Sequence, residues 1–206
     1  GSEMCIRDSC IPTFTASKTT IGEPQIGSYG LYFGRVTEEK GVETVIKAYE
    51  KLPEYTVKIM GDDTTDEAKR LKKYVKDHKM KNVEFLGFKS GEELEDIIKG
   101  ARFTLIPSIW YDNLPNTALE SFQYSKPVIA SNIGSLPELV SDGENGYLFE
   151  PSNVEDLIKK IKMLDDDILV EKMGQASRKR LENRFAPQSH YEALMKIFNE
   201  AVKNRK

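Results

Sequence analysis

The sequence predicts an α/β domain built on a doubly wound parallel sheet. From Tyr29 onward, strand-like and helix-like patterns alternate six times, as in folds that place helices on both faces of a sheet. Several of the short strand patterns are apolar throughout, which is typical of parallel strands buried on both faces. Glycines end the first two strands, at Gly34 and Gly61.

Short apolar runs give the strands, and apolar residues at helical spacing give the helices. The run YGLYF, for example, is followed by Val42, Val45, Ile46 and Tyr49 on one helical face. Strands are predicted at 29–33, 55–60, 83–88, 103–106, 127–130 and 147–149. Helices are predicted at 42–52, 68–78, 94–98, 117–124, 136–140 and 154–164, and from there to about residue 203. Capping boxes are predicted at Ser90 with Glu93 and at Ser152 with Glu155.

Composition excludes several classes of protein. The chain has 206 residues and a net charge of −3, which argues against a general nucleic-acid binder. No apolar run approaches the ~18 residues of a membrane-spanning helix. The two cysteines, Cys5 and Cys10, lie in a polar leader and form no disulfide framework. We therefore expect a reduced, cytoplasmic protein.

The chain divides into a leader and one domain. Residues 1–10 show no periodicity and resemble a cloning or sequence-assembly artefact. Residues 11–28 are rich in Thr, Ser, Gly and Pro, as linkers are. We expect 1–28 to be leader and linker, in part artefactual or disordered, and 29–206 to be the folded domain.

The loop after the first strand carries two cations. In doubly wound sheets, ligands bind outside the carboxyl ends of the strands, so the loops following the strands are where chemistry is expected. The first loop reads GRVTEEKG, with Arg35 and Lys40 flanking the start of a helix. Helix N-termini favour anions, and two cations would strengthen a phosphate site there. The alternative is a solvated turn in which Glu38 and Glu39 neutralise both cations.

The loop after the fourth strand carries the segment DNLPNTALE. If Pro115 is the first residue of the helix, the free N–H groups include those of Asn116 and Thr117. Asp112 then lies beside the helix N-terminus, and Glu120 lies further along the helix. Carboxylates accept sugar hydroxyls and free N–H groups suit phosphate. The alternatives are a turn residue at Asp112 and a surface acid at Glu120.

Other chemical signatures are weak or missing. There is no GxxxxGK[ST] and no GxGxxG, and no Cys/His group has metal-ligand spacing, so no metal is expected. His78 and His190 are single histidines in helical segments, for which structural roles are expected. Trp110 either packs on a ligand or fills the core of its loop.

The order of these segments resembles a known family. GRVTEEKG, IMGDD, VEFLGF, LPNTALES and KPVIASNIGSLPELVSDGENGYLF follow one another as in the C-terminal, donor-binding domain of GT-B glycosyltransferases. The resemblance is greatest to the large retaining group known as group 1 or family 4, and it covers about residues 29–200. It implies a Rossmann-like fold, the C-terminal half of a GT-B fold.

The resemblance also implies site residues. Arg35 and Lys40 would hold the donor diphosphate, and Glu120, the second acid of a Glu-x7-Glu motif, would bind the ribose. Asp112 stands where the family has the first Glu, near the donor sugar, and is one methylene shorter. Ser135 replaces the second glycine of a GGxPE motif. The remaining implied donor contacts are backbone groups at Asn113, Leu114, Asn116 and Thr117 and base-framing positions at Gly61, Leu86 and Phe88.

The implied activity is metal-independent, retaining transfer of a hexose from a UDP- or GDP-linked donor, with no cofactor. A GT-B enzyme also needs an N-terminal acceptor domain, for which this chain has no room. We therefore expect the chain alone to bind donor but not to transfer, with membrane association only through that other domain. Polysaccharide biosynthesis is the expected setting. The alternatives are a non-catalytic nucleotide-sugar-binding module and a GT-B-like sugar-nucleotide epimerase.

Overall fold

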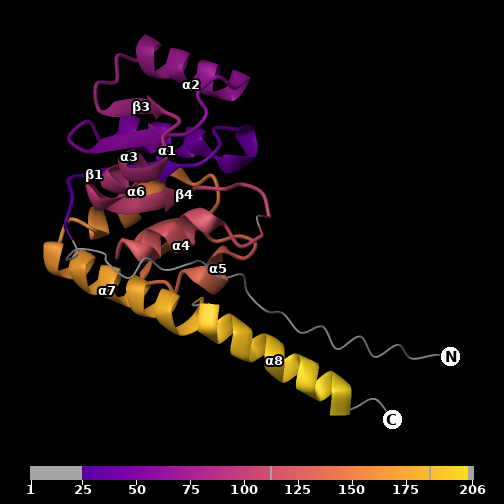
Figure 1. Ribbon diagram of the computed structural model, residues 1–206. Coiled ribbons are helices and arrows are strands. Elements are labelled where there is room, and N and C mark those ends of the chain that lie inside the picture. Colours follow the sequence, from indigo (N-terminus) through magenta and orange to yellow (C-terminus); the bar gives the residue numbers. More distant parts are fainter. Residues whose placement is uncertain (1–24, 112, 186, 204–206) are drawn as a thin grey trace.

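A computed structural model describes residues 25–111, 113–185 and 187–203 (Figure 1). Its centre is a six-stranded parallel sheet with the order β3-β2-β1-β4-β5-β6, the order of Rossmann-type nucleotide-binding folds. The predicted fold class is confirmed. The strands are β1 (Tyr29–Phe33), β2 (Thr56–Met60), β3 (Val83–Gly87), β4 (Ala101–Ile106), β5 (Val128–Ser131) and β6 (Gly146–Phe149).

Helices cover both faces of this sheet, as the alternating sequence pattern predicts. A short 3₁₀ turn, Glu38–Lys40, precedes the first of them. The helices are α1 (Val42–Glu50), α2 (Asp66–Asp77), α3 (Gly91–Lys99), α4 (Asn116–Gln123), α5 (Leu136–Leu139), α6 (Val154–Met163), α7 (Asp167–Arg184) and α8 (Pro187–Lys203).

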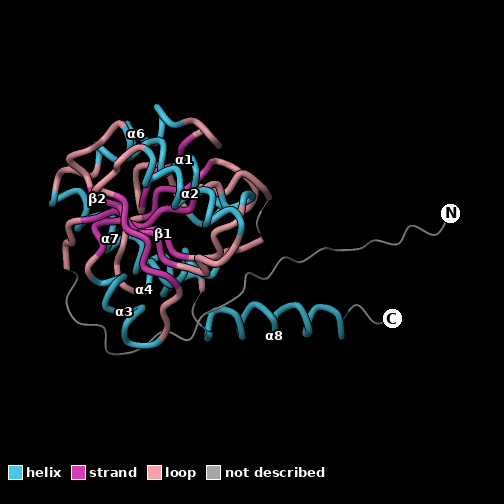
Figure 2. Tube along the Cα trace, turned by 90° about the horizontal axis from the view of Figure 1, so that it is seen from above, coloured by secondary structure: helices cyan, strands magenta, loops and turns pink. Residues whose placement is uncertain are grey.

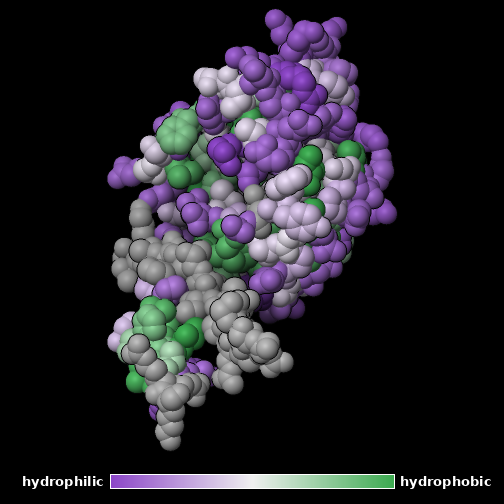
Figure 3. All heavy atoms as spheres, turned by 90° about the vertical axis from the view of Figure 1, so that its right-hand side faces the viewer, coloured by the Kyte–Doolittle hydropathy of each residue, from purple (hydrophilic) through white to green (hydrophobic). Residues whose placement is uncertain are grey.

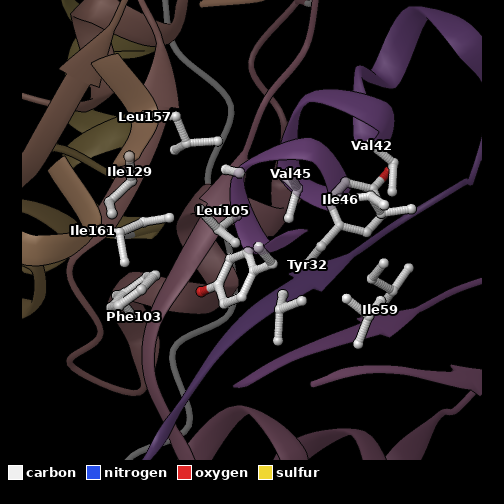
Figure 4. Close-up of a cluster of buried hydrophobic side chains, with 14 of the residues drawn as sticks. Tyr32, Val42, Val45, Ile46, Ile59, Phe103, Leu105, Ile129, Leu157 and Ile161 are labelled. Atoms are coloured by element: carbon white, nitrogen blue, oxygen red, sulfur yellow. The ribbon is translucent and has the colours of Figure 1, made fainter. Parts of the chain in front are cut away.

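The alternation of side chains along β1 divides the core into two layers. Tyr32 points to one face, where it joins Val45 of α1 and Ile161 of α6 in a large apolar cluster (Figure 4). Its neighbours Leu31 and Phe33 point to the opposite face and pack beside α3. Both faces of the sheet are therefore shielded from water at β1, which explains why the sequence of this strand is apolar throughout.

Helix α7 joins the two layers beyond the β6 edge of the sheet. Its first half contributes Val170 and Met173 to the cluster under α1 and α6. Its second half contributes Leu181 and Phe185 to the cluster under α4 and α5. The helix is thus anchored on both sides, and only its outer face is left to solvent.

Helix α8 behaves differently, because none of its residues is buried. It projects away from the body of the domain (Figure 2). The apolar stripe of Tyr191, Met195, Phe198 and Val202 is 36–73% exposed, and apolar side chains gather on this helix (Figure 3). No helix within the described part of the chain is long and apolar enough to cross a membrane.

Three predicted helix starts are wrong in detail. Ser90 precedes α3 but makes no side-chain capping bond, and Glu93 pairs with Lys89 instead. Ser152 has a left-handed backbone and is not the N-cap of α6. The N-cap is Asn153, whose side chain accepts a hydrogen bond from the Asp156 N–H at 3.0 Å. Pro115 is the N-cap of α4 rather than its first helical residue.

Candidate functional site

The carboxyl ends of β1 and β2 are fastened together by backbone contacts. The Gly34 N–H donates to the Met60 carbonyl at 2.9 Å, and the Gly61 N–H donates to the Gly87 carbonyl at 3.0 Å. A Cβ at Gly61 would lie 1.8 Å from the Gly34 carbonyl oxygen, so only glycine fits. These contacts bring three consecutive strand ends to one level and form the floor of the site.

A second set of contacts joins the loop after β1 to the loop after β4. The Ile109 N–H donates to the Glu39 carbonyl at 3.0 Å. Gly41 has a left-handed φ of 65°, and a Cβ there would lie 2.0 Å from the Pro107 carbonyl oxygen. Within the first loop, the buried Tyr32 hydroxyl donates to the Arg35 carbonyl at 2.5 Å and fixes the backbone there. The two loops are thereby held as one unit although about seventy residues separate them in sequence.

Between these loops lies a small cavity of 190 Å³, here called the inner cavity. Its walls include Arg35 and Lys40 from one loop and Asn116 and Thr117 from the first turn of α4. The predicted meeting of two cations with a helix N-terminus is therefore present in the structure. The field of this cavity favours an anion.

The first turn of α4 has backbone donors to offer. Pro115 caps the helix without a side-chain hydrogen bond, and the Ala118 N–H already donates to the Pro115 carbonyl. The N–H groups of Asn116 and Thr117 precede it at the helix end and are the ones left for a ligand.

A buried hydroxyl chain holds α4 in that position. The Thr104 hydroxyl, on β4, donates to the Ser121 hydroxyl at 2.8 Å. Ser121 in turn donates to the Thr117 carbonyl at 2.6 Å. Both side chains are fully buried, so the chain links the central strand directly to the turn that lines the inner cavity.

A second cavity of 310 Å³, here called the outer cavity, adjoins the first. The two share Phe33, Gly34, Arg35 and Thr117 in their walls. The outer cavity adds Gly61, Phe88 and Glu120. Burial raises the pKa of the Glu120 carboxyl, because the charged form loses hydration. The Phe88 ring is 75% exposed at the rim.

Charge pairing around the cations is partial. The Thr37 hydroxyl donates to the Glu39 carboxylate at 2.7 Å. That bond is the main reason the pKa of Glu39 is lowered; Arg35 and Lys40 contribute less. Among the described residues no carboxylate lies within ion-pair distance of Arg35. The solvated-turn alternative predicted that Glu38 and Glu39 neutralise both cations. Glu39 is instead bonded mainly to Thr37, and the charge of Arg35 is left available to a ligand.

Not every predicted residue lines a cavity. Arg35, Lys40, Asn116 and Thr117 line the inner cavity, and Gly61, Phe88 and Glu120 line the outer one. Three further predicted residues, Leu86, Asn113 and Leu114, line neither cavity. Asp112 is not among the residues that the structure describes. Leu86 is half-buried in the apolar layer beside α3, Leu114 packs against the layer under α4, and Asn113 is exposed.

The structure also adds residues that the motifs did not predict. Ser108 is 1% exposed and lines the inner cavity. Met60, Asp62, Lys89 and Leu94 line the outer cavity. Ser108, Asp62 and Lys89 each come within two residues of the end of a parallel strand, so the strand-end rule alone could have found them. Trp110 is 67% exposed and does not fill a loop core.

The two cavities together can hold an elongated ligand with an anionic centre. The inner cavity offers cations and backbone donors, which suit phosphate oxygens. The outer cavity offers a carboxylate for hydroxyl groups and an apolar wall for a flat ring. The described residues contain no group of His, Cys, Asp and Glu that could hold a metal ion.

Comparison with known proteins decides the family. Residues 17–180 match the family described as glycosyl transferases group 1. The chain belongs to this glycosyltransferase family. One curated relative, an uncharacterized glycosyltransferase of Methanocaldococcus jannaschii, is 29% identical over 174 residues, which are 84% of this chain and 48% of that protein. The chain thus spans about half the length of this relative.

Solved structures agree on the fold. The Anabaena protein Alr3699/HepE superposes with a TM-score of 0.75 at 21% identity, covering 84% of this chain and 48% of that one. The C-terminal domain of a group 1 glycosyltransferase from Francisella tularensis gives a TM-score of 0.68 at 27% identity, covering 79% of this chain and 89% of that one. This group 1 chain therefore has the Rossmann-like fold that forms one half of a GT-B glycosyltransferase.

Proposed function

We propose that this domain binds the nucleoside diphosphate part of a nucleotide-sugar donor for hexosyl transfer. The observation that carries the proposal is the inner cavity, where Arg35, Lys40 and the N-terminal turn of α4 converge. The diphosphate would occupy this cavity. The nucleoside would extend into the outer cavity, with ribose hydroxyls on Glu120 and the base between Gly61 and Phe88.

The same groups supply the chemistry of transfer. When the bond between the sugar and the diphosphate breaks, negative charge grows on the departing phosphate oxygen, and preplaced donors stabilise it. Arg35, Lys40 and the N–H groups of Asn116 and Thr117 would do so. The acceptor hydroxyl forms the new bond to the sugar, and its proton passes to the departing diphosphate. We assign Asp112 to the sugar hydroxyls, with retention of configuration and without a metal, as in the sequence prediction.

The length comparison supports a second part of the proposal. Because the chain spans about half of its relative, we propose that residues 29–206 are the donor domain. A separate acceptor domain would complete the cleft, and residues 29–206 alone would bind donor without transferring sugar. The open apolar face of α8 is available to such a domain. We place the active enzyme in the cytoplasm, with membrane association only through the acceptor domain.

Calorimetric titration with UDP, GDP and ADP tests the donor site. HepE, which shares this fold, was solved with UDP and glucose, so UDP is the first ligand to try. We expect one nucleotide to bind, with the same affinity in EDTA. Arg35→Gln should weaken it by about 10- to 100-fold, because charged hydrogen bonds contribute about 1.5–3 kcal/mol.

Two further variants sharpen the titration. Glu120→Gln should weaken the nucleotide but leave free pyrophosphate unaffected, since Glu120 lines only the outer cavity. Lys76→Gln on α2 removes a charge outside both cavities and should change nothing. Binding that survives Arg35→Gln unchanged, or that depends equally on Lys76, would overturn the assignment.

A further inference from the structure

The outer face of α7 carries a second group of cations, remote from the donor site. Together with the loop 141–145 it forms a groove of 580 Å³, here called the α7 groove. That loop precedes the amino end of β6, whereas the donor cavities lie at the carboxyl ends of the strands. The α7 groove shares no lining residue with either donor cavity.

Within the described part of the chain, four cations and one carboxylate line the groove. The cations are Lys172, Lys179, Arg180 and Arg184, and the carboxylate is that of Glu144. Lys172 and Lys179 have no ion-pair or hydrogen-bond partner among residues 25–111, 113–185 and 187–203. This surplus of positive charge stands out on a chain whose net charge is −3.

The two arginines are held in place by the segment 138–141, and Nη2 of Arg184 also lies 4.0 Å from the Glu138 carboxylate. Arg180 donates from Nη1 to the Ser141 hydroxyl at 2.9 Å and from Nη2 to the Glu138 carbonyl at 2.6 Å. Arg184 donates to the same carbonyl oxygen at 3.2 Å. Two guanidinium groups therefore share one acceptor; burial and, to a lesser extent, the like charge of Arg184 lower the pKa of Arg180.

One donor in this arrangement is unused. The Nε of Arg180 is buried and has no hydrogen-bond partner within the described chain. A buried donor without a partner is costly, and two adjacent guanidiniums repel. An anion in the groove would offset the repulsion. The Nε itself is buried beyond the reach of a ligand, so the surplus charge of the groove is what an anion would neutralise.

The spacing and lining of the groove select the kind of anion. Lys172 and Arg184 are twelve residues apart, which is about 18 Å along a helix, so one phosphate cannot reach all the cations. The remaining walls are Gly143, Ala176, Asn183 and Glu144. Among the described residues that line it, no aromatic side chain is there to stack a base, and no large apolar one is there to enter a bilayer. An amide and a carboxylate suit hydroxyl groups.

We propose that the α7 groove binds a stretch of acidic glycan, a chain of hydroxylated rings carrying carboxylate or phosphate groups at intervals. The cations would pair with the acidic groups, and Asn183 and Glu144 would hydrogen-bond to the hydroxyls between them. The groove would hold a polymer away from the donor site. Binding at the groove is independent of nucleotide binding.

The test is calorimetric titration of the 206-residue chain with tetragalacturonate, which carries four carboxylates, and with neutral maltotetraose. We expect tetragalacturonate to bind and maltotetraose not to. The double variant Lys172→Gln/Lys179→Gln should weaken tetragalacturonate by about tenfold or more. The matched variant Lys73→Gln/Lys76→Gln on α2 removes the same charge and should weaken it less than about twofold.

The groove variant should bind UDP as the unmodified chain does, so that failure here is distinct from failure at the donor site. Equal weakening by both double variants would show general charge attraction and overturn the proposal. So would equal binding of maltotetraose. Tighter, lysine-dependent binding of a single-stranded oligonucleotide or of phosphatidylglycerol vesicles would overturn it in favour of nucleic acid or membrane.

Discussion

The molecule holds cations in two different ways. At the carboxyl ends of the strands, Arg35 and Lys40 lie in a cavity of 190 Å³ together with a helix N-terminus. On α7, four cations are spread along a groove of 580 Å³. The first group is positioned by two loops whose backbones are in contact. The second group is spaced by the helical turns of α7, which carries all four cations.

The difference indicates two different ligands. A small cavity with convergent donors matches one compact anionic centre, because every donor reaches the same few oxygens. A row of cations on a helix matches an extended chain, because each donor reaches a different group. The backbone contacts also imply that the first site is sensitive to changes in the glycines at which its loops meet.

Gly41→Ala should have the largest effect of the changes considered. A Cβ at Gly41 would meet the Pro107 carbonyl at 2.0 Å, on top of a left-handed φ of 65°. We expect about 3 kcal/mol of destabilisation in urea unfolding, from left-handed strain and overpacking together. UDP binding should also weaken, since the two loops that frame the inner cavity would separate.

Gly91→Ala is the matched control, because Gly91 has a similar φ of 59° and open space around its Cβ position. It should cost only about 1 kcal/mol. Equal losses for the two alanine variants would mean that backbone conformation, and not the approach of the two loops, makes Gly41 necessary.

Lys126 offers a third way of holding a cation and a pH-dependent prediction. Its buried ammonium donates to the carbonyls of Gln25 and Lys99, both at 2.6 Å, with no carboxylate partner among the described residues. Burial lowers the pKa of Lys126 from 10.5 to about 8. Between these two values the unfolded chain binds more protons than the folded one, so the free energy of unfolding rises with pH.

Lys126→Met should remove that rise. We expect the free energy of unfolding of the unmodified chain to gain about 1–2 kcal/mol over Lys126→Met between pH 7.5 and pH 9.5. Urea unfolding at the two pH values measures it, with Lys76→Met as an exposed control that should show no such difference. A difference between the proteins that does not change with pH would contradict the burial of a charged Lys126.

Thr104→Val should have the smallest effect, about 1 kcal/mol in urea unfolding, because it removes one buried hydrogen bond to Ser121. Ser131→Ala is the matched control. The Ser131 hydroxyl is also fully buried but lacks a partner in the described structure, so its removal should be neutral or stabilising. A larger loss at Ser131 than at Thr104 would refute the supporting role of the hydroxyl chain under α4.

The sequence predicts the sheet and nearly all helices because their signals are local. In β1, for example, neighbouring side chains point to opposite faces of the sheet: Tyr32 lies in one core layer, and Leu31 and Phe33 lie in the other. The capping errors at Ser90 and Ser152 have a different cause. A left-handed backbone at Gly91 and at Ser152 redirects the chain at these helix starts, and the capping-box pattern does not predict that turn.

The site is predicted less completely, because its walls come from distant segments. Arg35, Lys40 and Glu120 stand in motifs, but Leu94 lines the outer cavity from within α3, where neither a motif nor the strand-end rule predicts it. The α7 groove has no motif at all. Charges along 172–184 look like any solvated helix face until the Glu138 carbonyl and Ser141 are seen to fix Arg180.

The most direct test of the account compares both ligands on both sites. UDP and tetragalacturonate are titrated into the unmodified chain, Arg35→Gln, and Lys172→Gln/Lys179→Gln. The account predicts that Arg35→Gln weakens UDP alone and that the double variant weakens tetragalacturonate alone. A variant that weakens both ligands to the same extent would contradict two separate sites and point to one diffuse field of positive charge.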